Sequence, residues 1–171
     1  MISPRLYIFV GYPGAGKTTI AKYINQKTGA HHLWADKERQ RMFSIVTHSI
    51  EESKTLYAKL NQQTKQQLTQ GTSVIFDTNF NYFSDRQLMR QLAAAHNAKL
   101  VIMWLTTPIA IAKSRALHQT HRDRNGYLVT MSEAEFIALT SRLETPSVDE
   151  QATKIDGAKI DYSLLDQILA I

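Results

Sequence analysis

The feature that most constrains this 171-residue chain is a glycine-rich turn between a strand-like and a helix-like segment. Residues 6–10, Leu-Tyr-Ile-Phe-Val, are continuously apolar, as in a parallel strand that is covered on both faces. Residues 11–18 read Gly-Tyr-Pro-Gly-Ala-Gly-Lys-Thr, and a helix is expected over residues 17–28. A strand that passes through a short turn into a helix is typical of α/β proteins.

The rest of the chain continues this alternation. Apolar runs at 74–76 and 100–105 predict two more buried strands, and weaker strands are expected at 32–34 and near 152–155. Helices are expected between them, at 50–70, 88–96 and 108–117, after Ser132, which forms a capping-box pattern with Glu135, and from about residue 161. The pattern predicts a single α/β domain over residues 1–171, with right-handed crossovers.

Composition excludes several classes of protein. With 43% hydrophobic and 20% charged residues, the chain is expected to bury a core rather than remain disordered. It has no cysteine, which excludes disulfides and thiolate metal sites, and no structural metal is expected. No apolar run approaches the roughly 20 residues of a membrane helix, and the N-terminus lacks a signal-peptide pattern. The expected location is therefore the cytoplasm, without a membrane partner.

The glycine-rich turn carries the most specific chemistry. It matches the Walker A or P-loop pattern G-x-x-x-x-G-K-[ST] in full, with Gly11, Gly16, Lys17 and Thr18 at the defined positions. Such a turn points successive backbone N–H groups at phosphate oxygens, and the following helix presents its positive dipole end to them. Lys17 is expected to reach the β- and γ-phosphates, and the Thr18 hydroxyl to ligate Mg²⁺. The motif predicts a site for ATP and Mg²⁺.

A carboxylate at the end of a neighbouring strand is the second part that such a site needs. Asp77 directly follows the apolar run 74–76 and is expected to bind Mg²⁺, either directly or through water. A turn or a helix cap is the alternative role for an aspartate at this position.

A possible acceptor side lies just after the expected strand at 32–34. Asp36 could accept the proton of an acceptor hydroxyl, and Arg39, three residues later on the same helix face, could hold an anionic group of the acceptor. The alternative is an N-cap aspartate with a surface arginine, and spacing alone does not separate the two interpretations.

Residues 113–130 form a basic cluster that leads into an Asn-Gly turn signal. This pattern predicts a mobile lid that excludes water and brings arginines to the phosphates. Arg115 is the arginine expected to stabilise the transferring phosphoryl group, and Arg122 and Arg124 are further lid residues. A solvated basic helix is the alternative interpretation.

The charge distribution agrees with an anionic nucleotide ligand. Residues 1–132 hold 17 Lys and Arg against 7 Asp and Glu, whereas residues 133–171 hold 3 against 8. The basic excess thus lies in the part that carries the phosphate loop and the predicted lid. This distribution weakens any argument from the overall charge of +5 for general nucleic-acid binding.

With these residues assembled, the chain resembles the small P-loop kinases related to polynucleotide kinase, zeta toxin and chloramphenicol phosphotransferase, which carry an AAA-type ATP-binding domain. The resemblance covers roughly residues 5–156. It rests on the segments GYPGAGKTT, ADKERQRMF, VIFDTNFNYFSDR and RLETP, and on the arginines after Pro108. It implies a three-layer fold with a parallel five-stranded sheet in the order 2-3-1-4-5, helices on both faces and a helical lid.

The resemblance also implies roles for individual residues. The nucleotide would be held by Gly11, Pro13, Gly14, Ala15, Gly16, Lys17, Thr18 and Thr19. Asp36 would be the base and Arg39 an acceptor-binding arginine. The acceptor and the metal would lie near Asp77, Thr78, Asn79 and Arg86. The spacing of Asp77, Thr78 and Asn79 is one residue shorter than the common D-x-T-N form of the group.

These observations predict an ATP- and Mg²⁺-dependent kinase, a transferase that moves the γ-phosphoryl group to a hydroxyl of a nucleic-acid 5′ end or a small molecule. Lys17, Asp36 and Arg115 are the predicted catalytic residues. Two alternatives stay open: a nucleotide-dependent binding module or ATPase switch without an acceptor, and a toxin-like kinase with a protein partner. The sequence does not identify the acceptor.

Overall fold

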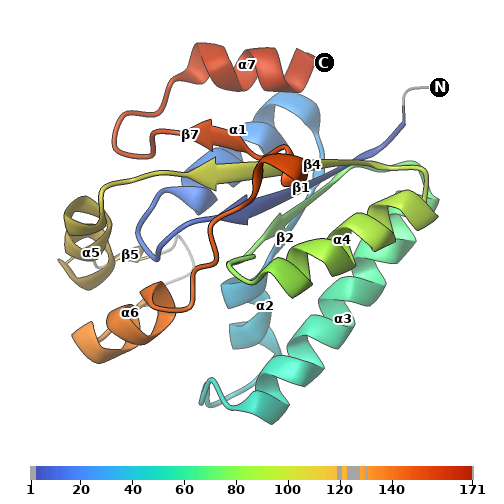
Figure 1. Cartoon of the computed structure of the whole chain (residues 1–171). Helices are drawn as coiled ribbons and strands as arrows, with labels where there is room; N and C mark the ends of the chain where they lie inside the picture. The colour runs from blue at the N-terminus through green and yellow to red at the C-terminus, as the bar shows by residue number, and fades with distance from the viewer. Residues whose placement is uncertain (1–2, 119–120, 123–127, 130, 171) are drawn as a thin grey trace.

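The centre of the molecule is one parallel sheet, seen in a computed structural model that describes residues 3–118, 121–122, 128–129 and 131–170. Its strands are β1 (Arg5–Val10), β2 (His31–Trp34), β3 (Val74–Asp77), β4 (Lys99–Leu105) and β7 (Thr153–Ile155). They lie in the order β2-β3-β1-β4-β7 (Figure 1). Numbered along the chain, this order is 2-3-1-4-5, so the predicted topology is confirmed.

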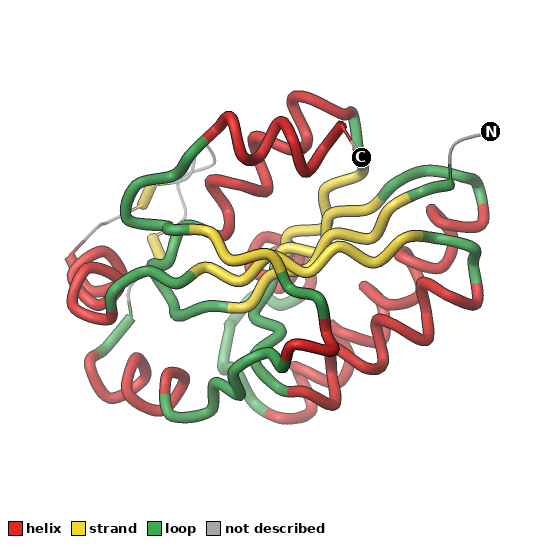
Figure 2. The backbone as a smooth tube through the Cα atoms, turned by 45° about the horizontal axis from the view of Figure 1, so that its top comes forward, coloured by secondary structure: helices red, strands yellow, loops and turns green. Residues whose placement is uncertain are grey.

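Both faces of the sheet are covered, which explains why its strands are continuously apolar. Leu6, Ile8 and Val10 of β1 join one buried cluster, and Tyr7 and Phe9 join another on the opposite face. The first face is covered by α3 (Ile50–Thr69) and α4 (Phe83–Ala95), and the second by α1 (Lys17–Thr28) and α7 (Tyr162–Ala170). Figure 2 shows these three layers, with the strands between two sets of helices.

The remaining elements surround the ends of the strands. They are α2 (Ala35–Met42), α5 (Ile109–His118), α6 (Glu133–Thr140), the 3₁₀ helix η1 (Val148–Glu150), and the short antiparallel pair of β5 (His121–Arg122) and β6 (Leu128–Val129). In Figure 1, α5, β5 and α6 gather at the left, where the arrowheads of β4 and β7 point. A helical lid was expected here, and α5 supplies a helix, but β5 and β6 follow it; two-residue strands carry no periodicity in the sequence.

Helix caps agree with the local sequence. Ser132 and Glu135 form the expected capping box at the start of α6. Ser49 caps α3 by accepting a hydrogen bond from the backbone N–H of Glu52. Gly29 ends α1 with a φ of 69°, a left-handed conformation that glycine adopts readily. Among the helices of the described residues, none has the length and apolar character needed to cross a membrane.

Candidate functional site

The glycine-rich turn, residues 11–18, connects β1 to α1 at the carboxyl edge of the sheet, as predicted. Its conformation depends on glycine: Gly14 has a φ of 76°, and a Cβ there would lie 2.2 Å from the carbonyl oxygen of Ala112 in α5. Asn81 supports the turn from the loop after β3, because its Oδ1 accepts a hydrogen bond of 3.1 Å from the Gly11 N–H. The turn is therefore held by elements distant in sequence.

Lys17 is buried beside this turn. Its Nζ donates hydrogen bonds to the carbonyl oxygens of Gly11, at 3.1 Å, and Tyr12, at 2.6 Å. Burial lowers the pKa of Lys17 to about 8, although the carboxylates of Asp77 and Asp36 act in the opposite direction. The ammonium group is thus charged at neutral pH and close to both predicted carboxylates.

Thr18 and Asp77 meet at the end of β3. The Thr18 hydroxyl donates a 3.3 Å hydrogen bond to Asp77 Oδ1, and the Asp77 side chain is 3% exposed. The other oxygen, Oδ2, lies 3.0 Å from His32 Nε2 on β2. Hard oxygen donors of this kind suit Mg²⁺, which usually takes one or two protein ligands and completes its shell with water and phosphate oxygens. The described residues contain no cluster of three or more His, Asp or Glu that could hold a metal.

Asp36 lies in the first turn of α2, with its side chain open to solvent. The protein around the carboxyl group reduces its hydration and, together with the Asp77 carboxylate, raises its pKa; Arg39 and Lys17 oppose this effect. The structure therefore brings Asp36, Asp77 and Lys17 into one electrostatic environment, as a base near a phosphate site would require.

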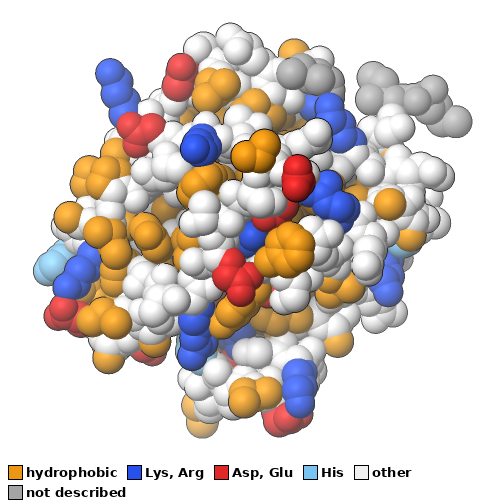
Figure 3. Space-filling view, viewed as in Figure 1, with side chains coloured by type: hydrophobic (Ala, Val, Ile, Leu, Met, Phe, Trp, Pro, Cys, Tyr) orange, Lys and Arg blue, Asp and Glu red, His pale blue; other side chains and the backbone are white. Residues whose placement is uncertain are grey.

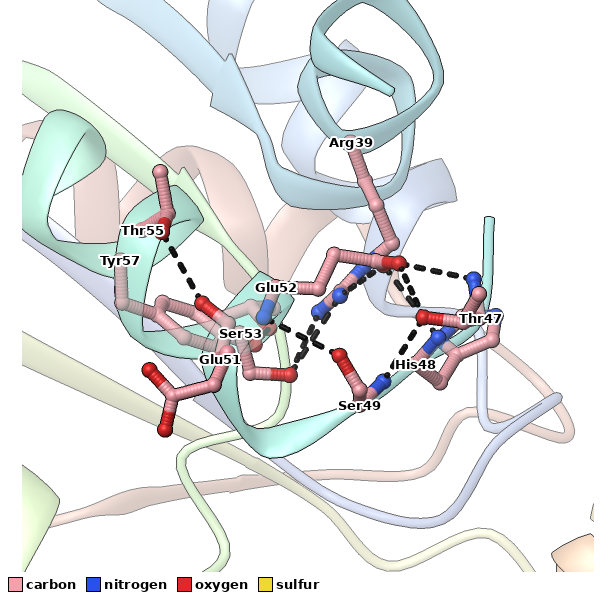
Figure 4. Close-up of polar contacts among 10 residues, drawn as sticks. Arg39, Thr47, His48, Ser49, Glu51, Glu52, Ser53, Thr55 and Tyr57 are labelled. Carbon is pink, nitrogen blue, oxygen red and sulfur yellow. Dashed lines mark hydrogen bonds and ion pairs between the residues drawn. The ribbon is translucent and has the colours of Figure 1, made fainter. Parts of the chain in front are cut away.

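Arg39, predicted to bind the acceptor, is engaged within the protein (Figure 4). Its side chain points from α2 toward α3, where Nη1 lies 2.6 Å from Glu52 Oε1, and both terminal nitrogens lie 3.4 Å from Ser53 Oγ. The residue is 7% exposed. Its charge is thus neutralised by a partner that the sequence analysis did not identify.

Arg86 is engaged in the same way. It is 1% exposed, and its Nε and Nη2 lie 2.6 and 3.0 Å from the two carboxylate oxygens of Glu150. Its Nη1 donates to the carbonyl oxygen of Phe80. The structure therefore joins Arg86 to η1 and to the loop after β3, which its side chain supports.

The loop after β3 carries the other predicted acceptor residues. Thr78 Oγ1 lies 2.9 Å from the hydroxyl of Tyr57 on α3. Asn79 Oδ1 is buried and has no hydrogen-bond partner among the described residues. A buried amide oxygen without a partner is unfavourable, and a bound hydroxyl could satisfy it.

The lid side contacts the P-loop through α5 and the loop after β7. Arg115 donates hydrogen bonds to the carbonyl oxygens of Gly157, at 2.7 Å, and Ala158, at 3.4 Å. A Cβ on Gly157 would lie 2.1 Å from the carbonyl oxygen of Ala15, so this loop packs directly on the turn. Of the other two predicted lid arginines, Arg122 belongs to β5 and Arg124 lies outside the described residues.

Sequence reasoning missed Asn81, His32 and the two glutamates that pair with arginines. For the glutamates a signal exists: Glu52 and Glu150 each stand three residues after a serine, at Ser49 and Ser147. This Ser-x-x-Glu pattern marks helix starts, where a glutamate is fixed close to the backbone. Asn81 and His32 had no comparable signal.

Comparisons with known proteins identify a family and a fold. Residues 6–146 match the model of a family described as an AAA domain. Among curated proteins, none matches the sequence.

Several solved structures share the fold. A candidate kinase from Chloroflexus aurantiacus is 21% identical with a TM-score of 0.75, and the match covers 99% of this chain and 98% of that one. An APS kinase from Mycobacterium tuberculosis, solved with AMPPNP and APS, is 15% identical with a TM-score of 0.72 and coverages of 99% and 98%. A gluconokinase from Sinorhizobium meliloti is 16% identical with a TM-score of 0.67 and coverages of 98% and 90%. The fold of this chain is that of P-loop kinases.

Proposed function

The chain belongs to the AAA domain family, and from this premise we propose that it is a kinase that uses ATP and Mg²⁺. It would transfer the γ-phosphoryl group of ATP to a hydroxyl of a small molecule or of a nucleic-acid 5′ end. We place this reaction in the cytoplasm, with which a chain that lacks cysteine is compatible.

The observation that carries the proposal is that two carboxylates, one buried and one exposed, lie near the phosphate loop. Asp77 is buried and hydrogen-bonded to Thr18, which suits a metal ligand. Asp36 is exposed and has a raised pKa, which suits a base. Lys17 lies within the electrostatic influence of both.

In the proposed reaction, residues 11–18 bind the phosphates through backbone N–H groups, and Lys17 supplies the cation for the β- and γ-phosphates. The oxygens of Thr18 and Asp77 would hold Mg²⁺, which when bound neutralises phosphate charge. Asp36 accepts the proton of the acceptor hydroxyl as that oxygen bonds to the γ-phosphorus. The bond between this phosphorus and the bridging oxygen breaks, and ADP leaves with its electron pair.

Other residues would orient the reactants. Asn79 would accept a hydrogen bond from the acceptor, because its buried Oδ1 lacks another partner among the described residues. We propose Arg115 for the transferring group, since α5 contacts Gly14 of the P-loop and the backbone of Gly157 and Ala158 restrains its guanidinium. Arg86 would act only as a positioning residue for the loop after β3.

The test measures transfer of label from the γ-phosphate of ATP to a panel of sugars, nucleosides and 5′-hydroxyl oligonucleotides. We expect acceptor-stimulated turnover that requires Mg²⁺. Asp36→Asn should bind ATP normally but lose about 10²- to 10⁴-fold in transfer rate. Glu51→Gln, an exposed carboxylate on α3, is the matched control and should transfer at the wild-type rate.

Two outcomes would contradict the proposal. Full transfer by Asp36→Asn would remove the assigned base. ATP turnover that no acceptor stimulates would instead support a nucleotide-dependent switch.

A further inference from the structure

The acceptor side holds little free positive charge. Arg39, the buried cation nearest to Asp36 in the sequence, has its charge matched by Glu52 at 2.6 Å. Arg86, on the next helix along that edge, has its charge matched by Glu150 at 2.6 Å. Both ion pairs are buried, so each guanidinium already has a carboxylate that balances its charge.

The Arg39 partner is firmly held. Glu52 Oε2 accepts hydrogen bonds from the Thr47 backbone N–H, at 2.7 Å, and from the Thr47 hydroxyl, at 2.8 Å, while Oε1 accepts from the His48 N–H at 3.3 Å. Burial alone would raise the pKa of Glu52, but the hydrogen bonds from Arg39 and Thr47 outweigh it and hold the pKa at about 2. The carboxylate is therefore charged at neutral pH.

Acidic and basic groups are both exposed near this pair, and Asp36 and Asp85 are among the acidic ones. Burial raises the pKa of the Tyr57 hydroxyl, and the carboxylates of Asp36 and Asp85 act in the same direction, while Arg39 opposes them. Burial raises the pKa of Asp85; the charge of Arg86 opposes this effect and the nearby Glu144 adds to it. Asp36, Asp85 and Glu144 have exposed side chains.

The wider surface offers no continuous basic band on the face drawn in Figure 3, where Lys and Arg side chains are scattered among acidic and hydrophobic ones. Two further basic residues are paired with glutamates: Arg41 with Glu38, and Lys113 with Glu133. A polynucleotide, which carries a negative charge at each phosphate, would need such a band.

Resting on the kinase function proposed above, we propose that the acceptor is an uncharged hydroxyl-bearing small molecule, such as a neutral sugar or polyol. An acceptor with a carboxylate or phosphate near its reacting hydroxyl would lose hydration next to Asp36, while the nearby Arg39 and Arg86 already have carboxylate partners. A neutral hydroxyl compound meets only hydrogen-bonding groups there, at Asp36, Thr78 and Asn79. Glu52 is then a specificity-determining residue, because its carboxylate balances the charge of Arg39 and so weakens the attraction of Arg39 for anions.

The test compares matched compounds that differ in charge: D-glucose with D-gluconate, and adenosine with adenosine 3′-monophosphate, together with a 5′-hydroxyl hexanucleotide. Binding is measured by calorimetry on protein saturated with AMPPNP and Mg²⁺, and transfer is measured separately with labelled ATP. We expect the neutral member of a pair to bind more tightly and to accept phosphate faster, with little dependence on salt. Tighter binding of the anionic members, no binding of any neutral member, or transfer confined to the hexanucleotide would overturn the inference.

A charge-changing variant sharpens the test. Glu52→Gln should release Arg39 and shift the anionic-to-neutral binding ratio toward the anion by about tenfold or more. Glu51→Gln, on the same helix and exposed, should leave the ratio unchanged. If Glu52→Gln unfolds, the double variant Arg39→Gln with Glu52→Gln keeps a hydrogen-bonded neutral pair and should retain the wild-type preference. An unchanged ratio in folded Glu52→Gln would contradict the specificity role.

The two proposals fail in different ways. If neutral compounds bind but never receive phosphate, the kinase function is contradicted and the charge selectivity is not. Phosphate transfer that favours anionic acceptors would leave the kinase function standing and sink the charge selectivity.

Discussion

The phosphate loop of the nucleotide side is one continuous segment, residues 11–18, whereas the acceptor side is assembled from α2 and the loop after β3, with α3, α4 and η1 behind them. The cation of the first side, Lys17, donates to backbone carbonyl oxygens, which carry no net charge. The arginines of the second side, Arg39 and Arg86, are each paired with a glutamate. Positive residues near a site therefore predict an anionic ligand only where no neighbouring carboxylate already balances their charge.

The largest expected effect concerns the buried pair of Arg86 and Glu150. Arg86→Leu leaves a buried carboxylate without its partner and should lower the free energy of unfolding by about 3–5 kcal/mol. Lys54→Met, which breaks the exposed pair with Glu51, should change it by less than about 0.5 kcal/mol. Urea denaturation of both variants checks this. A small effect at Arg86 would mean that the residue is not a structural support and could serve a substrate.

Among the residues of the nucleotide side, Lys17 should have the largest effect on the rate of phosphoryl transfer. Lys17→Met removes the cation expected at the β- and γ-phosphates and should slow phosphoryl transfer by about 10²- to 10³-fold. Lys22→Met, on the same helix but with its Nζ 5.1 Å from the centre of the Trp34 ring, should cost at most a few-fold. Steady-state rates for both variants make the comparison. An equal loss of rate in the two variants would show that any positive charge on α1 has this effect, and would contradict a specific role for Lys17.

Asn81 connects the two sides, because it lies in the loop after β3 and accepts a hydrogen bond from Gly11. Asn81→Ala leaves this N–H unpaired at a buried position and should lower the free energy of unfolding by about 1–3 kcal/mol. Calorimetric titration with AMPPNP should show weaker binding, because the turn is less well held. Asn61→Ala, outside the site on α3, should bind as the wild type does; an equal loss there would argue against a specific support.

The smallest expected effect is on the pH dependence of stability. The pKa of Glu52 is depressed to about 2, so its stabilising pair is present above pH 4.5 and is lost as the pH falls toward 2. Glu52→Gln has no such group and should lose less stability over this interval. Thermal melts at pH 5, 4 and 3 compare the variants, with Glu51→Gln as control. Parallel curves for wild type and Glu52→Gln would contradict the assigned pair.

Much of the fold could be predicted because it depends on local patterns. The helix over 17–28 has the expected ends, since a P-loop precedes it and Gly29 stops it. The apolar run at 74–76 became a buried strand that extends to Asp77, which placed this carboxylate beside Thr18 as expected. The strand order came from the family resemblance, and the sheet agrees with it.

The charge state of the acceptor side could not be predicted in the same way. Arg39 pairs with Glu52, 13 residues away in the sequence, and Arg86 pairs with Glu150, 64 residues away. Neither pairing follows from helical spacing. The pairing of His32 with Asp77 likewise depends on the neighbouring positions of β2 and β3. These pairings depend on contacts between helices and strands, and the sequence alone does not show which of those elements pack against each other.

The most direct test of the account is a crystal structure of the protein with AMPPNP, Mg²⁺ and a neutral acceptor selected by the binding experiments. We expect the acceptor hydroxyl within about 2.6–3.2 Å of the Asp36 carboxylate, with the pair of Arg39 and Glu52 intact. A hydroxyl bound away from Asp36, or a displaced Glu52 with the ligand on Arg39, would contradict the proposed division between a phosphate-binding side and an uncharged acceptor side.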